Sequence, residues 1–244
     1  MMQPFNLIKA KNYEELSQTA SEIIIKVLKE NPHSLYCFAG GDTPVRTLEL
    51  LVQAHHEKKI NLCEAYYIGL DEWVGLDNSS DGSCISYMKR NLFDPANIPK
   101  EQIHFFNAKS KDLEEECNLA NEYIKKHGGI TLSLLGVGVN GHLGFNEPGT
   151  SFESLAHVVD LNEITQKVGE KYFEQDVTIS QGITLGIKQI LESQYLILEA
   201  SGETKKEAIK KLLESEITKD WPVTALKLHK NCTVVLDGML QIDI

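Results

Sequence analysis

The sequence has little of what marks secreted, membrane-bound or metal-stabilised proteins. Its five cysteines are an odd number without a CxxC pair, and this argues against a disulfide framework and against a zinc site. The opening residues, Met1-Met2-Gln3-Pro4-Phe5-Asn6, contain neither a basic segment nor a long apolar run. We therefore expect no signal peptide, no membrane span, no bound metal and a cytoplasmic location.

Positive charge is also scarce. The chain has 24 Lys and Arg against 35 Asp and Glu, which gives a formal net charge of -11 at pH 7. This excess of negative charge disfavours nucleic-acid binding, so any anionic ligand must be held by local groups such as helix N-termini and a few lysines. Apolar residues, in contrast, make up 42% of the 244, enough for a packed core. No repeat or low-complexity linker divides the chain, and we expect a single domain over residues 1–244.

Segments with the periodicity of strands and helices alternate along the chain. We expect strands at 7–10, 35–39, 65–70, 102–106, 131–136, 156–160, 194–199 and 232–236. We expect helices at 13–30, 44–57, 84–93, 110–127, 163–172, 182–191 and 205–215. The alternation predicts an α/β fold: a doubly wound, largely parallel sheet with helices on both faces.

The most informative stretch is Leu132–Gly149. It opens as a buried strand and continues with four glycines in nine residues, which is typical of tight turns and close backbone approach. His142 and Glu147 follow within this segment. An imidazole and a carboxylate after a strand end are placed where α/β proteins present their chemistry, and they form a candidate acid/base pair.

The same glycines satisfy the dinucleotide-binding pattern G-x-G-x-x-G at residues 136–141, and Asp160 lies about 20 residues further on. That pattern requires a helix to begin at its third glycine. Here two more glycines and Pro148 follow within eight residues, and no helix tolerates that composition. We therefore do not expect a nicotinamide or flavin cofactor.

A second glycine-rich stretch, Gly40-Gly41-Asp42-Thr43-Pro44, follows the strand at 35–39. Thr43 is a plausible N-cap and Pro44 a plausible first helical residue. Free backbone N–H groups at a helix start bind anions, so the stretch is a candidate phosphate site. An ordinary strand-to-helix turn is the alternative, and Asp42 argues for it because a carboxylate repels phosphate.

Two further polar stretches also follow strands. In Asp71-Glu72-Trp73, a partly buried carboxylate could act as a base. The alternative is that this segment is a solvated turn. Before the last long helix, Thr204 with Glu207 fits a capping box, which puts Lys205 at the first helical position. The helix dipole disfavours a cation there unless an anion is shared, although a surface lysine is the alternative. In a parallel sheet all these strand ends lie at one edge, and we expect them to form one site.

These segments resemble a known family. Residues 70–76 and 135–149, with further matches at 182–187 and 226–229, are similar to the hexosamine-6-phosphate deaminase/isomerase family. The resemblance covers nearly the whole chain, and its most specific part reads Asn140-Gly141-His142-Leu143-Gly144-Phe145-Asn146-Glu147-Pro148. It implies a doubly wound α/β fold and the conversion of an amino-sugar phosphate to a ketose phosphate plus ammonia, without metal or organic cofactor.

The resemblance also implies roles for individual residues. Asp71 matches the base that moves a proton between C2 and C1 of the sugar. His142 matches the group that opens the pyranose ring, Glu147 orients it, and Asn140 stands where some members have an aspartate. Phosphate-contacting positions match Gly41, Thr43, Lys171 and Lys205, and with their neighbours we expect the substrate-binding set to be Gly40, Gly41, Asp42, Thr43, Lys171 and Lys205.

Some positions depart from the deaminase pattern. The loop at 39–44 is nearer to that of 6-phosphogluconolactonases, which share the fold, whereas residues 145–148 differ from that group. Trp73 and Cys84 are similar to galactosamine-6-phosphate members. The deaminase of glucosamine or galactosamine 6-phosphate is thus the main hypothesis, with a lactonase as the alternative. A non-catalytic sugar-phosphate sensor would not need Asp71, His142 and Glu147. We expect a monomer or a small homo-oligomer.

Overall fold

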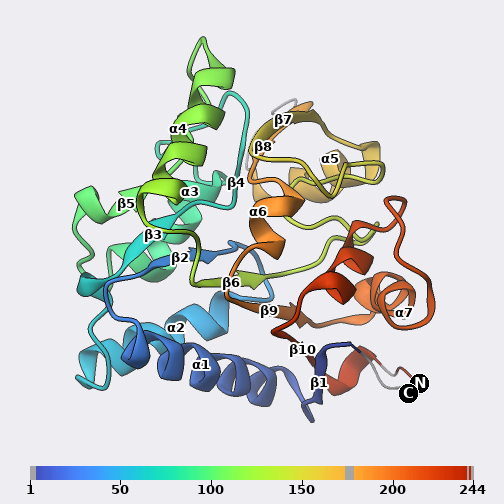
Figure 1. Ribbon diagram of the computed structural model, residues 1–244, viewed down its shortest axis with the longest axis horizontal. Helices are drawn as coiled ribbons and strands as arrows, with labels where there is room; N and C mark the ends of the chain where they lie inside the picture. The colour runs from blue at the N-terminus through green and yellow to red at the C-terminus, as the bar shows by residue number, and fades with distance from the viewer. Residues whose placement is uncertain (1–3, 174–178, 241, 243–244) are drawn as a thin grey trace.

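The computed structural model describes residues 4–173, 179–240 and 242. Its main feature is a parallel sheet of seven strands in the order β1-β10-β9-β6-β2-β3-β5 (Figure 1). The strands are β1 (Asn6–Lys9), β2 (Leu35–Phe38), β3 (Tyr66–Ile68), β5 (Ile103–His104), β6 (Leu132–Leu135), β9 (Tyr195–Ala200) and β10 (Cys232–Leu236). The central strands are buried on both faces, as a parallel sheet between helices requires.

Helices cover both faces of this sheet, so the predicted doubly wound fold is confirmed (Figure 1). On one face lie α1 (Tyr13–Glu30) and α2 (Val45–His56). On the other lie α4 (Leu113–Lys126), α6 (Ile187–Leu191) and α7 (Lys206–Glu214). The apolar residues of α1 recur at helical spacing and are buried, and the Asn12 side chain accepts the N–H of Glu15 to start the helix.

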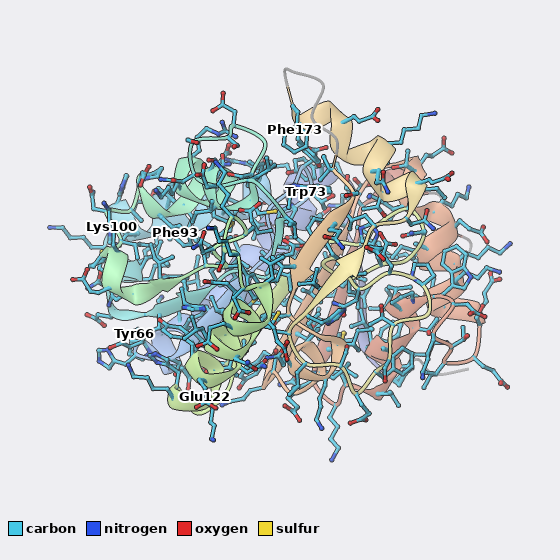
Figure 2. All side chains as sticks on the ribbon, turned by 90° about the horizontal axis from the view of Figure 1, so that it is seen from above. Tyr66, Trp73, Phe93, Lys100, Glu122 and Phe173 are labelled. Atoms are coloured by element: carbon cyan, nitrogen blue, oxygen red, sulfur yellow. The ribbon has the colours of Figure 1, made fainter. Side chains whose placement is uncertain are left out.

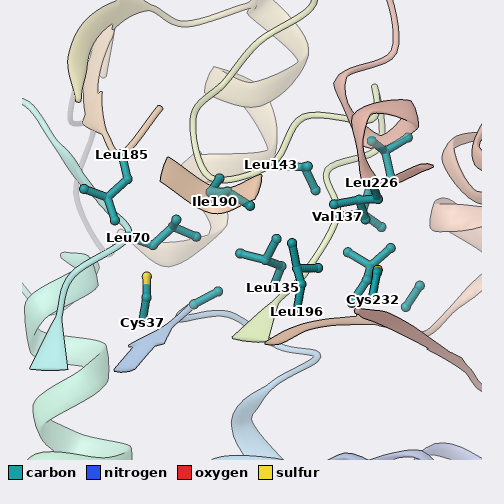
Figure 3. Close-up of a cluster of buried hydrophobic side chains, with 14 of the residues drawn as sticks. Cys37, Leu70, Leu135, Val137, Leu143, Leu185, Ile190, Leu196, Leu226 and Cys232 are labelled. Carbon is teal, nitrogen blue, oxygen red and sulfur yellow. The ribbon is translucent and has the colours of Figure 1, made fainter. Parts of the chain in front are cut away.

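The larger core lies between the sheet and the second group of helices. Figure 3 shows its centre, where Leu135 of β6 and Leu196 of β9 face Ile190 of α6. Leu143, from the glycine-rich loop after β6, is fully buried in the same cluster. Burial of a leucine side chain is worth about 2 kcal/mol. The loop is therefore anchored to the core by its own apolar residue.

A second sheet of three antiparallel strands, in the order β4-β8-β7, was not predicted. Its strands are β4 (Asp71–Trp73), β8 (Gln181–Thr184) and β7 (His157–Asp160). The predicted helix at 182–191 is wrong over its first residues, because β8 occupies them and α6 begins only after Gly186. The predicted strand at 65–70 is confirmed as β3, which is shorter, and the strand β4 that follows it from Asp71 was not predicted. Pairing with strands on both sides overrides the local apolar periodicity of 182–191.

Shorter helical segments complete the fold. They are α3 (Cys84–Met88) with a π-helical turn at Lys89–Phe93, and α5 (Glu163–Gly169). The 3-10 turns are Leu62–Glu64, Lys100–Gln102, Glu170–Tyr172, Glu203–Lys205, Pro222–Leu228 and Gly238–Leu240. Trp73 packs on Phe145 and Phe173 in a separate small core, and Figure 2 shows Trp73 and Phe173 close together. In the described ranges, no helix combines the length and apolarity that a membrane crossing needs.

The sheet order places a switch point between β2 and β6. These two strands are neighbours, but the chain continues from β2 towards β3 and from β6 towards β9. The loops that leave their carboxyl ends therefore diverge to opposite sides. This divergence opens a crevice, which is where ligands bind in open α/β sheets.

Candidate active site

A cavity of about 460 Å³ lies at this crevice. Its walls include residues from each of the four predicted stretches, 40–44, 71–73, 136–147 and 201–205. Residues of the segment 165–172, from α5 and the turn that follows it, form another wall. The prediction that these strand ends converge on one site is confirmed.

Asp71 lies at the start of β4, opposite Thr184 of β8, and is partly open to the cavity. Burial, with the negative charge of Glu72, raises its pKa to about 7, although a hydrogen bond from Cys84 opposes the rise. Gly144, at φ 58°, brings the loop after β6 so close that a Cβ atom there would lie 3.4 Å from Asp71 Oδ2. The carboxyl group is thus shielded and near its midpoint at neutral pH, as a general base requires.

The neighbouring acid, Glu72, has a different environment. It is fully buried and does not line the cavity. Its carboxylate accepts the backbone N–H groups of Trp73, Cys84 and Ile85, each at 2.9 Å. Burial raises its pKa in spite of these bonds. Glu72 therefore ties the start of α3 to β4, and of the two adjacent acids only Asp71 is placed for chemistry.

His142 presents its ring to the cavity from the glycine-rich loop. Its Nδ1 atom lies 3.2 Å from Thr165 Oγ1 and 3.8 Å from Glu147 Oε2. The ring lies directly over Gly138, where an added Cβ atom would come within 2.3 Å of it, so only glycine fits there. Nε2 has no hydrogen-bond partner within the described part of the chain, and it is free to act on a ligand.

Glu147 stands behind the imidazole and does not line the cavity. Its Oε2 atom accepts a 2.8 Å bond from Asn140 Nδ2, and its Oε1 atom accepts the backbone N–H of Asn162 at 3.3 Å. Burial raises the pKa of Glu147, but hydrogen bonds and charge from His142, with Thr165 and Asn140, outweigh it and leave the pKa lowered. The carboxylate stays ionised beside the ring. Asn140 contacts the acid and not the cavity.

The loop 40–43 presents unpaired backbone N–H groups at the wall of the cavity. Its carbonyl groups are held by two tyrosines: Tyr87 donates to Gly41 O at 2.5 Å, and Tyr13 donates to Asp42 O at 3.1 Å and Thr43 O at 2.9 Å. The N–H groups of the four loop residues have no partner among the residues that the structure describes. Unpaired backbone donors in a loop that precedes a helix are suited to bind an anion.

The predicted helix caps at this site are wrong. α2 begins at Val45 with Pro44 as its N-cap, and no side chain caps it. α7 begins at Lys206 after a 3-10 turn at Glu203–Lys205, and the expected capping box of Thr204 is not formed. No side chain caps α2, so backbone donors before it stay available to a ligand, whereas the 3-10 turn before α7 uses the N–H groups of Lys205 and Lys206.

Two lysines approach the loop. Lys205 lines the cavity, and burial and the charge of Lys171 lower its pKa, although Asp42 opposes this. Burial also lowers the pKa of Lys171, but its bond to Asp42, with contributions from Tyr172, raises it overall. The Nζ atom of Lys171 lies 2.5 Å from Asp42 Oδ2. The six predicted substrate-binding residues are thus all at the cavity, and the charge of Asp42 is paired.

Sequence reasoning missed Thr165, Tyr13 and Tyr87. Each acts through a hydroxyl group that touches a loop far away in the sequence, and no local spacing signals such a contact. The only hint is that Thr165 lies in the first turn of a helix capped by Asn162. Over the described residues, no group of three or more His, Cys, Asp or Glu is placed to hold a metal ion.

Comparison with known proteins places this chain among relatives of known activity. A family model described as glucosamine-6-phosphate isomerases/6-phosphogluconolactonase matches residues 9–235. A glucosamine-6-phosphate deaminase of Bacillus pumilus is 39% identical over 95% of this chain and 97% of its own length, and one of Shouchella clausii is 41% identical over 95% and 94%.

Solved structures show the same relationship. A monomeric glucosamine-6-phosphate deaminase superposes with a TM-score of 0.93 at 37% identity, covering 96% of this chain and 98% of its own. The 6-phosphogluconolactonase of Trypanosoma brucei superposes with a TM-score of 0.79 at 16% identity, covering 98% of each chain, which shows the shared fold alone. The chain therefore belongs to the glucosamine-6-phosphate isomerase/6-phosphogluconolactonase family.

Proposed function

We propose that this protein is a glucosamine-6-phosphate deaminase, which converts glucosamine 6-phosphate and water to fructose 6-phosphate and ammonia. One observation carries the proposal: a shielded carboxylate, Asp71, lines the same cavity as His142 and the loop 40–43. A base, an imidazole and an anion site are the groups that isomerisation of a sugar phosphate needs. The names of the relatives support the same reaction.

The phosphate end of the substrate is assigned to the loop 40–43 with Lys171 and Lys205. Backbone N–H groups bind phosphate oxygens without a desolvated counter-charge, and the two ammonium groups supply charge against the net -11 of the chain. Fixing the phosphate here orients the sugar towards Asp71 and His142. Such positioning can contribute several kcal/mol to catalysis.

The first chemical step is ring opening, in which a proton moves from O1 to the ring oxygen O5. Nε2 of His142 is the group proposed to carry it, since it faces the cavity and has no protein partner. Glu147 and Thr165 hold the opposite nitrogen and so set the ring orientation. Asn140 keeps the Glu147 carboxylate in place.

The second step is proton transfer from C2 to C1. The C1 aldehyde formed by ring opening acidifies the C2 proton, and Asp71 removes it. O1 takes a proton from the protonated 2-amino group of the substrate, which gives an enolamine. The carboxylic acid then returns the proton to C1, which leaves an imine at C2. Water adds to this imine and ammonia departs, so the ketose phosphate is formed. A pKa of about 7 lets Asp71 both accept and return the proton at neutral pH.

An assay with three substrates tests the proposal. Ammonia release is measured from glucosamine 6-phosphate and from galactosamine 6-phosphate, and lactone hydrolysis from 6-phosphogluconolactone. We expect ammonia from the glucosamine ester. Preference for the galactosamine ester would assign a role to Trp73 and Cys84 at the cavity wall. Lactone hydrolysis without ammonia from either ester would replace the proposal by a lactonase.

We also propose a monomer of one domain. The solved relative with a TM-score of 0.93 is monomeric, which supports this choice over a small homo-oligomer. Light scattering coupled to gel filtration should give a mass near 27.4 kDa. A cytoplasmic location stays a prediction, which fractionation of the cells would test.

A further inference from the structure

The loop proposed to bind phosphate carries a carboxylate of its own. Asp42 belongs to the loop after β2, and Lys171 to the 3-10 turn after α5, 129 residues away in sequence. Their side chains meet at the cavity, where Lys171 Nζ donates to Asp42 Oδ2 at 2.5 Å. A negative group is thus bound to one of the two lysines that face the proposed phosphate position.

The two lysines differ in whether their ammonium groups already have an ion-pair partner. Lys205 makes no ion pair within the described part of the chain, whereas Lys171 is held by Asp42 and also lies 4.7 Å from the centre of the Tyr172 ring. Asp42 is itself one of the four residues whose backbone N–H groups are proposed to bind phosphate. A phosphate ester on those N–H groups would therefore lie close to the Asp42 carboxylate and would compete with it for Lys171.

We propose that Asp42 is an internal competitor for Lys171, whose carboxylate occupies the ammonium group that the substrate's phosphate would contact. The inference rests on the proposed function, and it deepens the phosphate site. Asp42 Oδ2 already binds the Lys171 ammonium group, so a phosphate that contacts this group must displace the carboxylate, and the Asp42–Lys171 bond must loosen when the dianion binds. Asp42 thereby weakens phosphate binding and sets the affinity of the site.

The expected change in phosphate affinity follows from the solvent exposure of the Asp42–Lys171 ion pair. The side chain of Asp42 is 67% exposed and that of Lys171 is 49% exposed. Exposed ion pairs are worth at most about 1 kcal/mol, which corresponds to roughly fivefold in binding. We therefore expect a two- to fivefold change in the Kd for phosphate, decreasing with added salt.

The test is a double-mutant cycle with inorganic phosphate as the ligand, measured by isothermal titration calorimetry at pH 8. The proteins are the unaltered chain, Asp42→Asn, Lys171→Gln and the double variant. We expect Asp42→Asn to tighten phosphate binding about two- to fivefold, and Lys171→Gln to weaken it. In the Lys171→Gln background, Asp42→Asn should change the Kd by less than about 1.5-fold.

Glu170→Gln is the matched control. It removes the same charge from the residue next to Lys171, and its carboxylate makes no ion pair in the described ranges. We expect less than about 1.5-fold change. Equal tightening by Asp42→Asn in both backgrounds would show direct repulsion and overturn the competition. Weaker binding by Asp42→Asn would show that Asp42 supports Lys171, and would overturn it too.

The assay does not depend on turnover, so it separates this inference from the proposed function. If the cycle behaves as expected while neither amino-sugar ester releases ammonia, the proposed reaction is wrong and the competition stands. If ammonia is released and the cycle is additive, only the competition is wrong. Phosphate binding by none of the proteins would refute both the anion site and the competitor.

Discussion

Two carboxyl groups with raised pKa values lie in different parts of this molecule. Asp71 is at the start of β4 in the small antiparallel sheet, and Glu199 is inside β9 of the large parallel sheet. Burial raises the pKa of both, to about 7 for Asp71 and about 8 for Glu199. Asp71 faces the cavity, whereas Glu199 is fully buried between the sheet and α2, where it accepts a 2.5 Å bond from Thr47 Oγ1.

The difference shows that a raised pKa does not by itself identify a catalytic group. Desolvation acts on both carboxyl groups alike, and Glu199 even has an oxygen without a partner in the described structure. What separates them is access, because only Asp71 has open space where a substrate carbon could lie. Both groups should cost stability at alkaline pH, and only one should contribute to activity.

The largest expected effect is on the rate. Asp71→Asn removes the base without changing the side-chain volume much, and we expect kcat to fall about 10³-fold or more. Stability should not fall, since a buried ionisable group is replaced by a neutral one. Ammonia release and thermal melting of the same sample measure both. A variant with more than about a tenth of the original kcat would refute the assignment of Asp71.

The matching change in the other region is Glu199→Gln. The pKa of Glu199 is higher in the folded state than the unfolded value of 4.5, so its stabilising contribution is complete below about pH 4.5 and is lost as the pH rises through about 8. At pH 8 we expect the glutamine to raise the free energy of unfolding by roughly 2–4 kcal/mol. Urea unfolding at pH 8 and at pH 5 measures the difference.

For Glu199→Gln the gain should be much smaller at pH 5, and kcat should stay within about twofold of the original value. A gain of equal size at both pH values would mean that the substitution acts through packing. A large loss of activity would remove the distinction between the two carboxyl groups, since Glu199 does not touch the cavity.

The pH profile of the rate separates the two groups further. Asp71 must be ionised to accept the C2 proton, so log kcat/KM should rise with pH and level off near pH 7. Between pH 7 and pH 5 we expect a loss of roughly 50-fold. Initial rates, measured at pH values where the protein stays folded, give this acidic part of the pH profile. The same rise of log kcat/KM with pH should be seen in Glu199→Gln. A shift of its midpoint in that variant would show that the two carboxyl groups are coupled.

The smallest expected effect concerns the support of the imidazole. Thr165→Val removes the hydroxyl 3.2 Å from His142 Nδ1 and leaves Glu147 at 3.8 Å as the remaining partner of that atom. We expect kcat to fall about three- to tenfold, in line with the loss of one hydrogen bond. Thr165→Ser keeps the hydroxyl and should retain most of the activity. If serine and valine have equal rates, the hydroxyl does not orient the ring.

The local pattern of the chain predicted most of the main sheet and the place of the site. Apolar periodicity distinguished strands from helices, and the alternation required a parallel sheet. Polar stretches after strand ends then had to meet at one edge, as Asp71, His142 and Lys205 do. The resemblance to a family added the roles of these residues, which no spacing could supply.

The errors lie where distant contacts outweigh local preference. Residues 182–184 have helix-like apolar spacing, but pairing with β4 and β7 makes them a strand. Thr43 and Thr204 have the composition of helix caps, yet extra turns displace both helix starts. For residues 182–184 and for Thr43, partners far along the chain provide hydrogen bonds that a local rule does not count. The turn before α7 is closed locally, by the bond from Lys205 N–H to Gly202 O.

The sequence by itself determined the strands of the main sheet, the long helices and the loops that carry chemistry, because those properties depend on the order of neighbouring side chains. Only the tertiary structure decided which carboxyl group of the pair 71/72 faces open space, which hydroxyl supports His142, and which lysine is paired. These outcomes depend on solvent exclusion and on contacts such as Asp42–Lys171, 129 residues apart, which exist only once the layers have packed.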